Sequence, residues 1–185
     1  MIFDLELCLK PEYLLDFSGK NTIFLREEKA EYEFAIKRIK NNSKIIGIYN
    51  LENLKHKYLY QKTSSNQYKN PKDCDYILIN EESKDIYFIE LKKNKIGSVE
   101  SINEQLSAGE IWLEHILFCA ERDKKELEAF DKHRICLRYT EGSRTTKSRN
   151  LPRKQGTGDK IYYEFRGRDI LYSKLKVQAL NNISR

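Results

Sequence analysis

Two short apolar runs joined by a polar tetrapeptide constrain the fold of this chain more than any other feature. The runs cover residues 75–80 and 85–92, and both are rich in Ile, Tyr and Phe. Residues 81–84 separate them, which is a length typical of a tight hairpin connection. We therefore predict a β-hairpin. If its turn is centred in the middle of that connection, Asp75 lies directly opposite Glu90 on the same face of the hairpin.

The segments around the hairpin indicate an α/β fold. Apolar residues recur at alternating spacings of three and four over 99–120, which predicts a long amphipathic helix. Residues 44–49, 134–139 and 161–165 favour strands. Residues 26–40 place apolar side chains on one side of a helical wheel, so we predict a helix there. Together these elements predict a mixed central β-sheet flanked by helices.

The remaining segments complete the expected organisation. Residues 3–9 alternate apolar and polar side chains and predict a half-exposed strand, whereas 140–160 is polar and predicts a long loop. A length of 185 residues suits a single domain spanning 1–185. Its core is expected at about 26–139, followed by the basic loop and last strand at 140–168.

The positive charge of the chain is concentrated in one segment. The chain has 34 Lys and Arg against 28 Asp and Glu, a formal net charge of +6. Between 144 and 168 eight basic residues face two acidic ones, so that segment alone carries the surplus of six. The basic residues are Arg144, Lys147, Arg149, Arg153, Lys154, Lys160, Arg166 and Arg168. A focused positive segment is what a nucleic-acid-binding surface requires, although a solvated loop has the same composition.

Cysteine spacing and hydropathy bear on the compartment. The four cysteines form no C-x-x-C pair, and the three histidines add no tight zinc spacing to them, so we expect reduced thiols. The first ten residues do not resemble a signal peptide, and no apolar run approaches the ~20 residues that span a bilayer. These features favour a cytoplasmic protein with no membrane partner.

A carboxylate pair and a lysine suggest the chemistry. Glu90 and Lys92 project to the same side because they are two residues apart on a strand. Asp75 and Glu90 would repel each other unless one is protonated or a cation bridges them. Mg²⁺, with Mn²⁺ as a substitute, accepts one or two carboxylates together with water and phosphate oxygens. Lys92 could orient an attacking water, so the pattern predicts metal-assisted hydrolysis of phosphodiesters.

Asp75, followed after fourteen residues by Glu90-Leu91-Lys92, resembles the PD-(D/E)xK nuclease superfamily, which includes many restriction enzymes. The resemblance implies a restriction-endonuclease-like core of a leading helix, a hairpin carrying the acids, a second helix and a further strand. It implies that Asp75 and Glu90 bind the metal together with the Leu91 carbonyl. Lys92 would be the catalytic lysine.

The resemblance also suggests accessory residues. Members often add a glutamate from the leading helix, and Glu28 is the first candidate, with Glu31 the second. A glutamine on the second helix is common in RecB-like members, and Gln105 is the corresponding candidate.

The resemblance and the residues together predict a Mg²⁺-dependent nuclease that acts on DNA rather than RNA, in restriction, phage defence or repair. It could work as a homodimer or with a protein partner. The alternative is a nucleic-acid-binding subunit of a larger complex with a vestigial nuclease site, and a third class is an interaction protein unrelated to nucleic acid. Structural roles also stay open: Asp75 as a strand-start residue bonded to nearby backbone, and Glu90 with Lys92 as a salt bridge on an edge strand.

Overall fold

The computed structural model describes residues 2–27, 31–40, 44–53, 72–93, 97–140, 151–158 and 160–176. The central sheet consists of β1 (Leu14–Leu15), β4 (Ile45–Tyr49), β5 (Tyr76–Asn80), β6 (Asp85–Lys93), β7 (Asp131–Tyr139), β8 (Arg153–Thr157) and β9 (Lys160–Gly167). A smaller sheet consists of β2 (Thr22–Glu27), β3 (Tyr32–Lys37) and β10 (Asp169–Leu171). The helices are α1 (Ile2–Cys8) and α3 (Val99–Cys119), with 3₁₀ turns η1 (Pro11–Tyr13), η3 (Lys124–Ala129) and η5 (Tyr172–Lys174).

The central sheet is mixed, as predicted. Its seven strands lie in the order β1-β4-β5-β6-β7-β9-β8, and β4, β5 and β6 form an antiparallel meander. The long helix α3 then returns the chain so that β7 pairs parallel to β6, and β9 pairs parallel to β7. Such a parallel connection needs a crossover, which α3 supplies. The C-terminal ends of β6, β7 and β9 therefore lie side by side at the same end of their strands.

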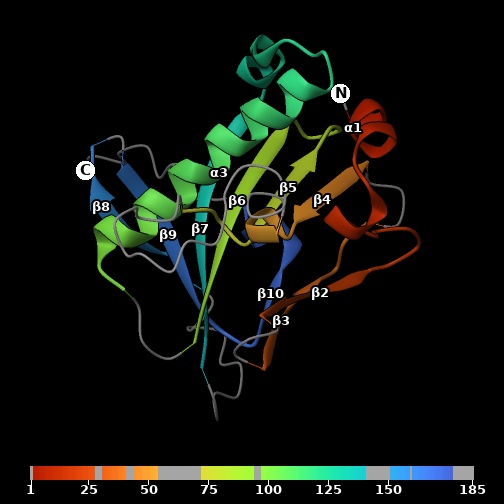
Figure 1. The fold of residues 1–185 in the computed structure, drawn as a ribbon. Helices are drawn as coiled ribbons and strands as arrows, with labels where there is room; N and C mark the ends of the chain where they lie inside the picture. The colour runs from red at the N-terminus through yellow and green to blue at the C-terminus, as the bar shows by residue number, and fades with distance from the viewer. Residues whose placement is uncertain are drawn as a thin grey trace, which may run out of the picture.

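The sheet is covered differently on its two faces. In Figure 1, α3 runs obliquely across the front of the sheet, and the small sheet of β2, β3 and β10 lies on the other side. One core contains Ile102, Leu106 and Leu113 of α3 packed on the sheet. The other contains Phe34 and Ile36 of β3 packed on the opposite face. The prediction of flanking helices therefore holds for one face only.

The predicted hairpin and long helix are confirmed. The strands β5 and β6 pair antiparallel in the predicted register, with Asn80 opposite Asp85. The Asn80 side-chain oxygen accepts hydrogen bonds from the backbone N–H groups of Glu82 and Ser83, each at 3.0 Å, and so closes the turn. Helix α3 begins after Ser98, whose hydroxyl oxygen accepts the backbone N–H of Ser101 at 3.1 Å.

The helix predicted over 26–40 is wrong. The segment instead contributes to an antiparallel pair of strands, β2 and β3. In β3 the apolar residues Tyr32, Phe34 and Ile36 alternate with Glu33 and Lys37, apart from a buried Ala35. Ala35 pairs with Asp169 of β10, more than 130 residues later in the chain. The apolar Ala35 between Phe34 and Ile36 breaks the alternation of the strand and imitates a helical period.

Two other local predictions also need correction. The segment 3–9 is predicted as a strand, but all of it except Leu9 lies in helix α1, which buries Leu5 completely and leaves Leu7 71% exposed. On a strand these two side chains would share a face, whereas on a helix they diverge. The loop predicted over 140–160 contains β8, an edge strand of sequence RKQGT with no apolar side chain to reveal it.

A glycine lets α3 approach the sheet closely. A Cβ atom at Gly109 would overlap the sulfur of Cys74 and lie 3.2 Å from a ring carbon of Phe88. Only a residue without a side chain fits at that point. Gly109 therefore sets the distance between α3 and the start of β5, which is where Asp75 lies.

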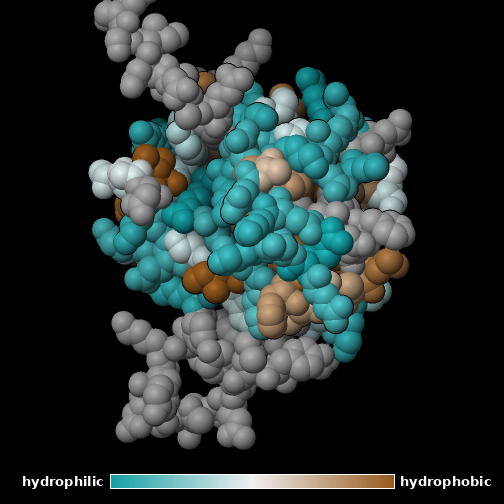
Figure 2. Space-filling model, turned by 90° about the horizontal axis from the view of Figure 1, so that it is seen from above, coloured by the Kyte–Doolittle hydropathy of each residue, from teal (hydrophilic) through white to brown (hydrophobic). Residues whose placement is uncertain are grey.

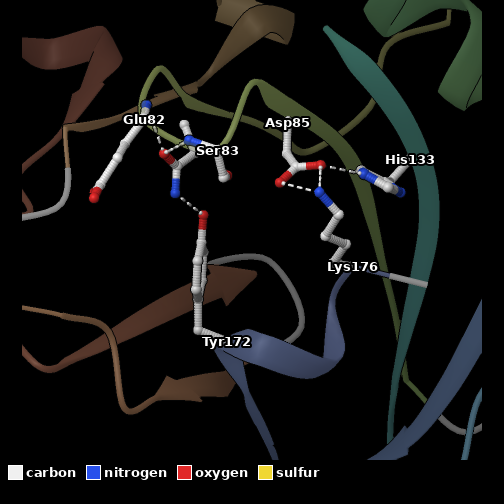
Figure 3. Close-up of polar contacts among 7 residues, drawn as sticks. Glu82, Ser83, Asp85, His133, Tyr172 and Lys176 are labelled. Carbon is white, nitrogen blue, oxygen red and sulfur yellow. Dashed lines mark hydrogen bonds and ion pairs between the residues drawn. The ribbon is translucent and has the colours of Figure 1, made fainter. Parts of the chain in front are cut away.

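The C-terminal segment docks onto the turn end of the hairpin through a polar cluster (Figure 3). The carboxylate of Asp85, only 1% exposed, accepts a hydrogen bond from Nε2 of His133 at 2.8 Å. Lys176 approaches the same carboxylate, with Nζ 3.1 Å from Oδ1 and 3.2 Å from Oδ2. Asn80 donates to the Tyr172 hydroxyl at 2.9 Å. These contacts hold the chain after β10 against the end of the sheet opposite to Asp75.

Replacing Asp85 by Asn is expected to lower the free energy of unfolding by about 2 kcal/mol at neutral pH. Burial alone would raise the pKa of Asp85, but hydrogen bonds from Ser83, His133 and Lys176 outweigh burial and hold the pKa below its ordinary value. A carboxyl with a lowered pKa adds stability that is lost as pH falls through that pKa. Urea denaturation should therefore show the difference between wild type and variant shrinking below about pH 4.

The matched control is Asp131→Asn, because Asp131 lies opposite Asp85 in the sheet but is exposed. It should change stability by less than about 0.5 kcal/mol. A loss for Asp85→Asn that is equal at neutral and acid pH would contradict the ionic role.

The visible surface is mostly polar. Seen from above, hydrophilic side chains predominate and the hydrophobic ones lie in small separate patches (Figure 2). Among the described residues, no helix is long and apolar enough to cross a membrane.

Candidate active site

The candidate site lies where β5 begins and β6 approaches its end. Asp75 directly precedes β5, and Glu90 and Lys92 lie in β6. Asp75 Oδ2 accepts the backbone N–H of Leu91 at 2.6 Å, which ties the two strands together at this level. The Leu91 side chain is buried in the core on the other face of the sheet, as predicted. The salt bridge between Glu90 and Lys92 that the structural alternative expected is present, but β6 pairs on both sides, so it does not lie on an edge strand.

Glu90 is the centre of the site. Its side chain is 1% exposed, although a carboxylate is rarely buried without full compensation. Oε1 accepts a hydrogen bond from Nε2 of Gln105 at 2.6 Å and also contacts Nζ of Lys92. Oε2 is buried and has no hydrogen-bond partner among the described residues. One oxygen is therefore held by two donors, and the other is left for a ligand.

The charges of the site are strongly coupled. Burial raises the pKa of Asp75 to about 7, against the lowering effect of the Leu91 N–H and the Lys92 ammonium. Burial and the charge of Asp75 raise the pKa of Glu90 well above its ordinary value. Burial would lower the pKa of Lys92, but Glu90 and Asp75 outweigh it and keep the amine protonated. Ionising both carboxyls at once is unfavourable here, and a bound cation would stabilise the doubly ionised form.

The donor set fits a hard divalent ion only in part. Asp75, Glu90 and the Leu91 carbonyl would supply oxygen ligands, and the buried Oε2 of Glu90 needs a partner. Mg²⁺ keeps several waters and takes substrate oxygens, so two carboxylates are a sufficient protein contribution. Within the described ranges, no group of three His, Cys, Asp or Glu side chains could hold a metal.

The accessory residues have different outcomes. Gln105 contacts Glu90 as described above, so the structure brings it to the site. Glu31 lies exposed in the turn between β2 and β3, with φ of 51°. Glu28 lies outside the described residues, and the helix that was expected to carry it is a strand.

Two acids near Asp75 were missed. The charges of Glu27 and Asp73 both raise the pKa of Asp75, which shows that they lie close to it. Glu27 is the last residue of β2, adjacent to the predicted Glu28. The pattern Asp73-Cys74-Asp75 was the sequence signal for Asp73, but nothing in the sequence brought β2 to this place.

Asp75 opens into a cleft of about 830 Å³. Its lining includes Glu27, Asp73, Arg26 and Tyr49, together with Asp75 itself. Acids therefore predominate around Asp75, and Arg26 in turn lies 3.4 Å from the carboxylate of Glu33. A phosphate would be repelled from this side of the site without a cation to compensate the acids.

Comparisons with known proteins identify no family for the chain. No protein-family model matches it, and searches of curated proteins and of solved structures find no similar protein. What the chain does is therefore inferred from its own residues.

The predicted basic surface is divided among several elements. Arg144, Lys147 and Arg149 lie outside the described residues. Arg153 lies opposite Glu164 in the sheet, on the face that carries Glu90 and α3, whereas the next residue, Lys154, points to the other face.

The remaining basic residues lie on or just after β9. Lys160 is exposed at the start of the strand, and Arg166 lies near its end. Arg168 lies over the ring of Tyr139, 5.8 Å from its centroid. Of the predicted basic residues that the structure describes, Arg153, Lys160 and Arg166 therefore lie on the face of the candidate site.

Proposed function

We propose that the chain is a metal-dependent nuclease that hydrolyses phosphodiester bonds, with DNA as the favoured substrate. The observation that carries the proposal is the buried Oε2 of Glu90, which has no hydrogen-bond partner in the described part of the chain and lies beside a second carboxyl, Asp75. A buried acid pair of this kind costs stability unless it binds a cation.

The order of elements supports the same proposal. A hairpin carries the acids, a helix crosses one face, and a further strand pairs parallel to the strand of Glu90. This arrangement agrees with the core of the PD-(D/E)xK nucleases that the sequence resembles. The leading helix of that resemblance does not lie where we predicted it.

Each residue of the site has a role in the proposal. Asp75, Glu90 and the Leu91 carbonyl hold Mg²⁺, which supplies Lewis-acid activation of water and of the phosphate when bound. Gln105 fixes Oε1 of Glu90 and leaves Oε2 for the metal. Lys92, kept protonated by the acids, orients the attacking water and offsets charge that builds on the phosphate oxygens.

The proposal is tested by nicking of supercoiled plasmid DNA in Mg²⁺ or Mn²⁺. Wild type is expected to nick DNA with either metal and not with EDTA. Lys92→Met should lower the rate by about a hundredfold, because the ammonium acts on charge that develops in the transition state. The matched control is Lys93→Met, since Lys93 is the next residue of β6 and points to the opposite face. Equal rates for wild type and Lys92→Met would overturn the enzyme assignment.

Tight DNA binding without cleavage is the other informative outcome. It would favour the alternative of a nucleic-acid-binding subunit with a vestigial site. Calorimetric titration with Mn²⁺ separates that case from a protein unrelated to nucleic acid, which would bind neither the metal nor DNA.

A further inference from the structure

A second acid–base pair repeats the Glu90–Lys92 pattern two strands away. Glu164 and Arg166 lie on β9 with the same spacing of two residues. The register of the parallel strands places Glu90 beside Cys136 and Cys136 beside Glu164. Glu164 is only 2% exposed, and Arg166 contacts its carboxylate as Lys92 contacts Glu90. The sheet therefore carries two similar pairs at one level and on one face.

The two pairs differ in their charge compensation. Glu90 meets one cation, and its Oε2 has no partner among the described residues. Glu164 meets two cations, because its Oε1 contacts Nε of Arg166 and lies 3.6 Å from Nη1 of Arg138. Two guanidinium groups therefore share the Glu164 carboxylate, whereas a single ammonium contacts Glu90 beside a second carboxyl. The first pair is therefore suited to a cation, and the second to an anion.

The register also aligns three basic side chains in a row. Lys92 lies beside Arg138, and Arg138 lies beside Arg166, on three adjacent parallel strands. Neighbouring strands are about 4.8 Å apart, so the row spans about 10 Å. Like charges in such positions repel one another. The buried Glu90 and Glu164, each two residues earlier on its strand, offset that repulsion. The row is thus a built feature rather than a scatter of surface charges.

The two arginines are held in place and reach solvent. The Arg166 side chain is 36% exposed and that of Arg138 is 23% exposed, whereas the carboxylate that holds them is buried. A guanidinium has five donors in a rigid fork that matches the oxygens of a phosphate. Contact with Glu164 engages Nε of Arg166, and a guanidinium has two further nitrogens that carry N–H donors.

We propose that Arg138 and Arg166, positioned by Glu164, bind a backbone phosphate of the nucleic-acid substrate beside the Glu90–Lys92 site. The substrate strand then crosses the ends of β6, β7 and β9, with one phosphate on the arginines and another at the metal ligands. This inference rests on the proposed function, since it assigns that site its second phosphate contact. Arg138 lies outside the basic segment of the sequence and becomes part of the surface only through the sheet.

The test measures DNA binding in EDTA by fluorescence anisotropy, with a labelled duplex, as a function of NaCl concentration. All variants are made on the Glu90→Gln background, so cleavage does not interfere. Arg138→Ala and Arg166→Ala should each weaken binding about tenfold. Each should also reduce the slope of log K against log salt by about one.

A charge-neutral variant guards against misfolding. Glu164→Gln combined with Arg166→Gln removes both members of the pair and leaves the net charge of the protein unchanged, with no buried carboxylate short of a partner. It should still reduce the salt slope by about one, because the phosphate contact is lost. A slope equal to that of the Glu90→Gln parent in this variant and in Arg138→Ala would overturn the inference.

Lys132→Ala is the matched control. Lys132 lies on β7 and on the same face as Arg138, but six residues earlier, about 20 Å along the strand. It should leave the slope unchanged, and an equal loss for Lys132→Ala and Arg138→Ala would show only a general effect of charge and overturn the assigned site.

The outcomes separate the inference from the proposed function. If wild type fails to cleave DNA but the arginine variants lower the slope, the phosphate site stands and the nuclease assignment fails. If wild type cleaves and the arginine variants bind like their parent, the nuclease stands and this phosphate site fails.

Discussion

Replacing Glu90 by Gln is expected to reduce the rate of DNA cleavage by about a thousandfold. The substitution keeps the shape of the side chain and its contact with Gln105, but removes the charge that would bind the metal. It also leaves the Lys92 ammonium without its nearest anion. The measurement is the rate of plasmid nicking at saturating Mg²⁺, together with calorimetric titration of Mn²⁺, in which the variant should show no binding.

Glu164→Gln is the matched control for metal binding. Glu164 is buried on the same face and at the same level of the sheet, but its carboxylate is occupied by Arg166 and Arg138. It should retain the wild-type affinity for Mn²⁺. Equal loss of Mn²⁺ binding in both variants would mean that the two glutamates affect the metal only through the fold.

The second large effect concerns stability, because ionisation of the site acids lowers the free energy of unfolding when no metal is bound. The Asp75 carboxyl has a pKa of about 7 in the folded protein, against 3.8 as the ordinary value. Between these pH values the folded protein holds a proton that the unfolded chain has released, so stability falls as pH rises through this window. Asp75→Asn removes the penalty and should raise the free energy of unfolding by about 2 kcal/mol at about pH 8.

The same variant should equal wild type near about pH 3, where the Asp75 carboxyl is protonated in both the folded and the unfolded protein. Thermal denaturation at the two pH values measures the difference. Mn²⁺ at the higher pH should raise the melting temperature of wild type and leave that of Asp75→Asn unchanged. A variant that is less stable than wild type at about pH 8 would show that the ionised Asp75 is stabilising, through the Leu91 N–H and Lys92.

These two substitutions connect stability with the proposed activity. A site that binds a cation through buried carboxylates is unstable when empty, and removing its charge gains stability at the expense of the function. Here the destabilising acids lie at the start of β5 and near the end of β6. The opposite end of the hairpin is stabilised by the Asp85 cluster, in which His133 and Lys176 compensate the carboxylate. The two ends of one hairpin therefore serve different purposes.

The candidate site could be predicted from the sequence because its residues are local. Asp75, Glu90 and Lys92 belong to one hairpin, and a tight turn determines which of them face each other. Gln105 lies on the helix that follows, and the family resemblance suggested it rather than any spacing in the chain. By contrast, Arg138, Glu164 and Arg166 become neighbours only when β7 and β9 pair in parallel. The strand β8 contains no apolar residue, so the sequence shows no alternating pattern that would predict it.

The sequence by itself determined the hairpin, the long helix α3 and the central acid–lysine group, because short-range periodicity and turn chemistry specify them. Only the tertiary structure decided that 26–40 contributes to two strands, since β3 pairs with β2 and with β10, a strand formed near the C-terminus. It also decided the charge arrangement: Glu27 and Asp73 gather at Asp75, and the Glu164–Arg166 pair with Arg138 lies on the same face, two strands from Glu90. Such contacts depend on the pairing order of strands distant in the sequence, and residue patterns along one segment carry no record of that order.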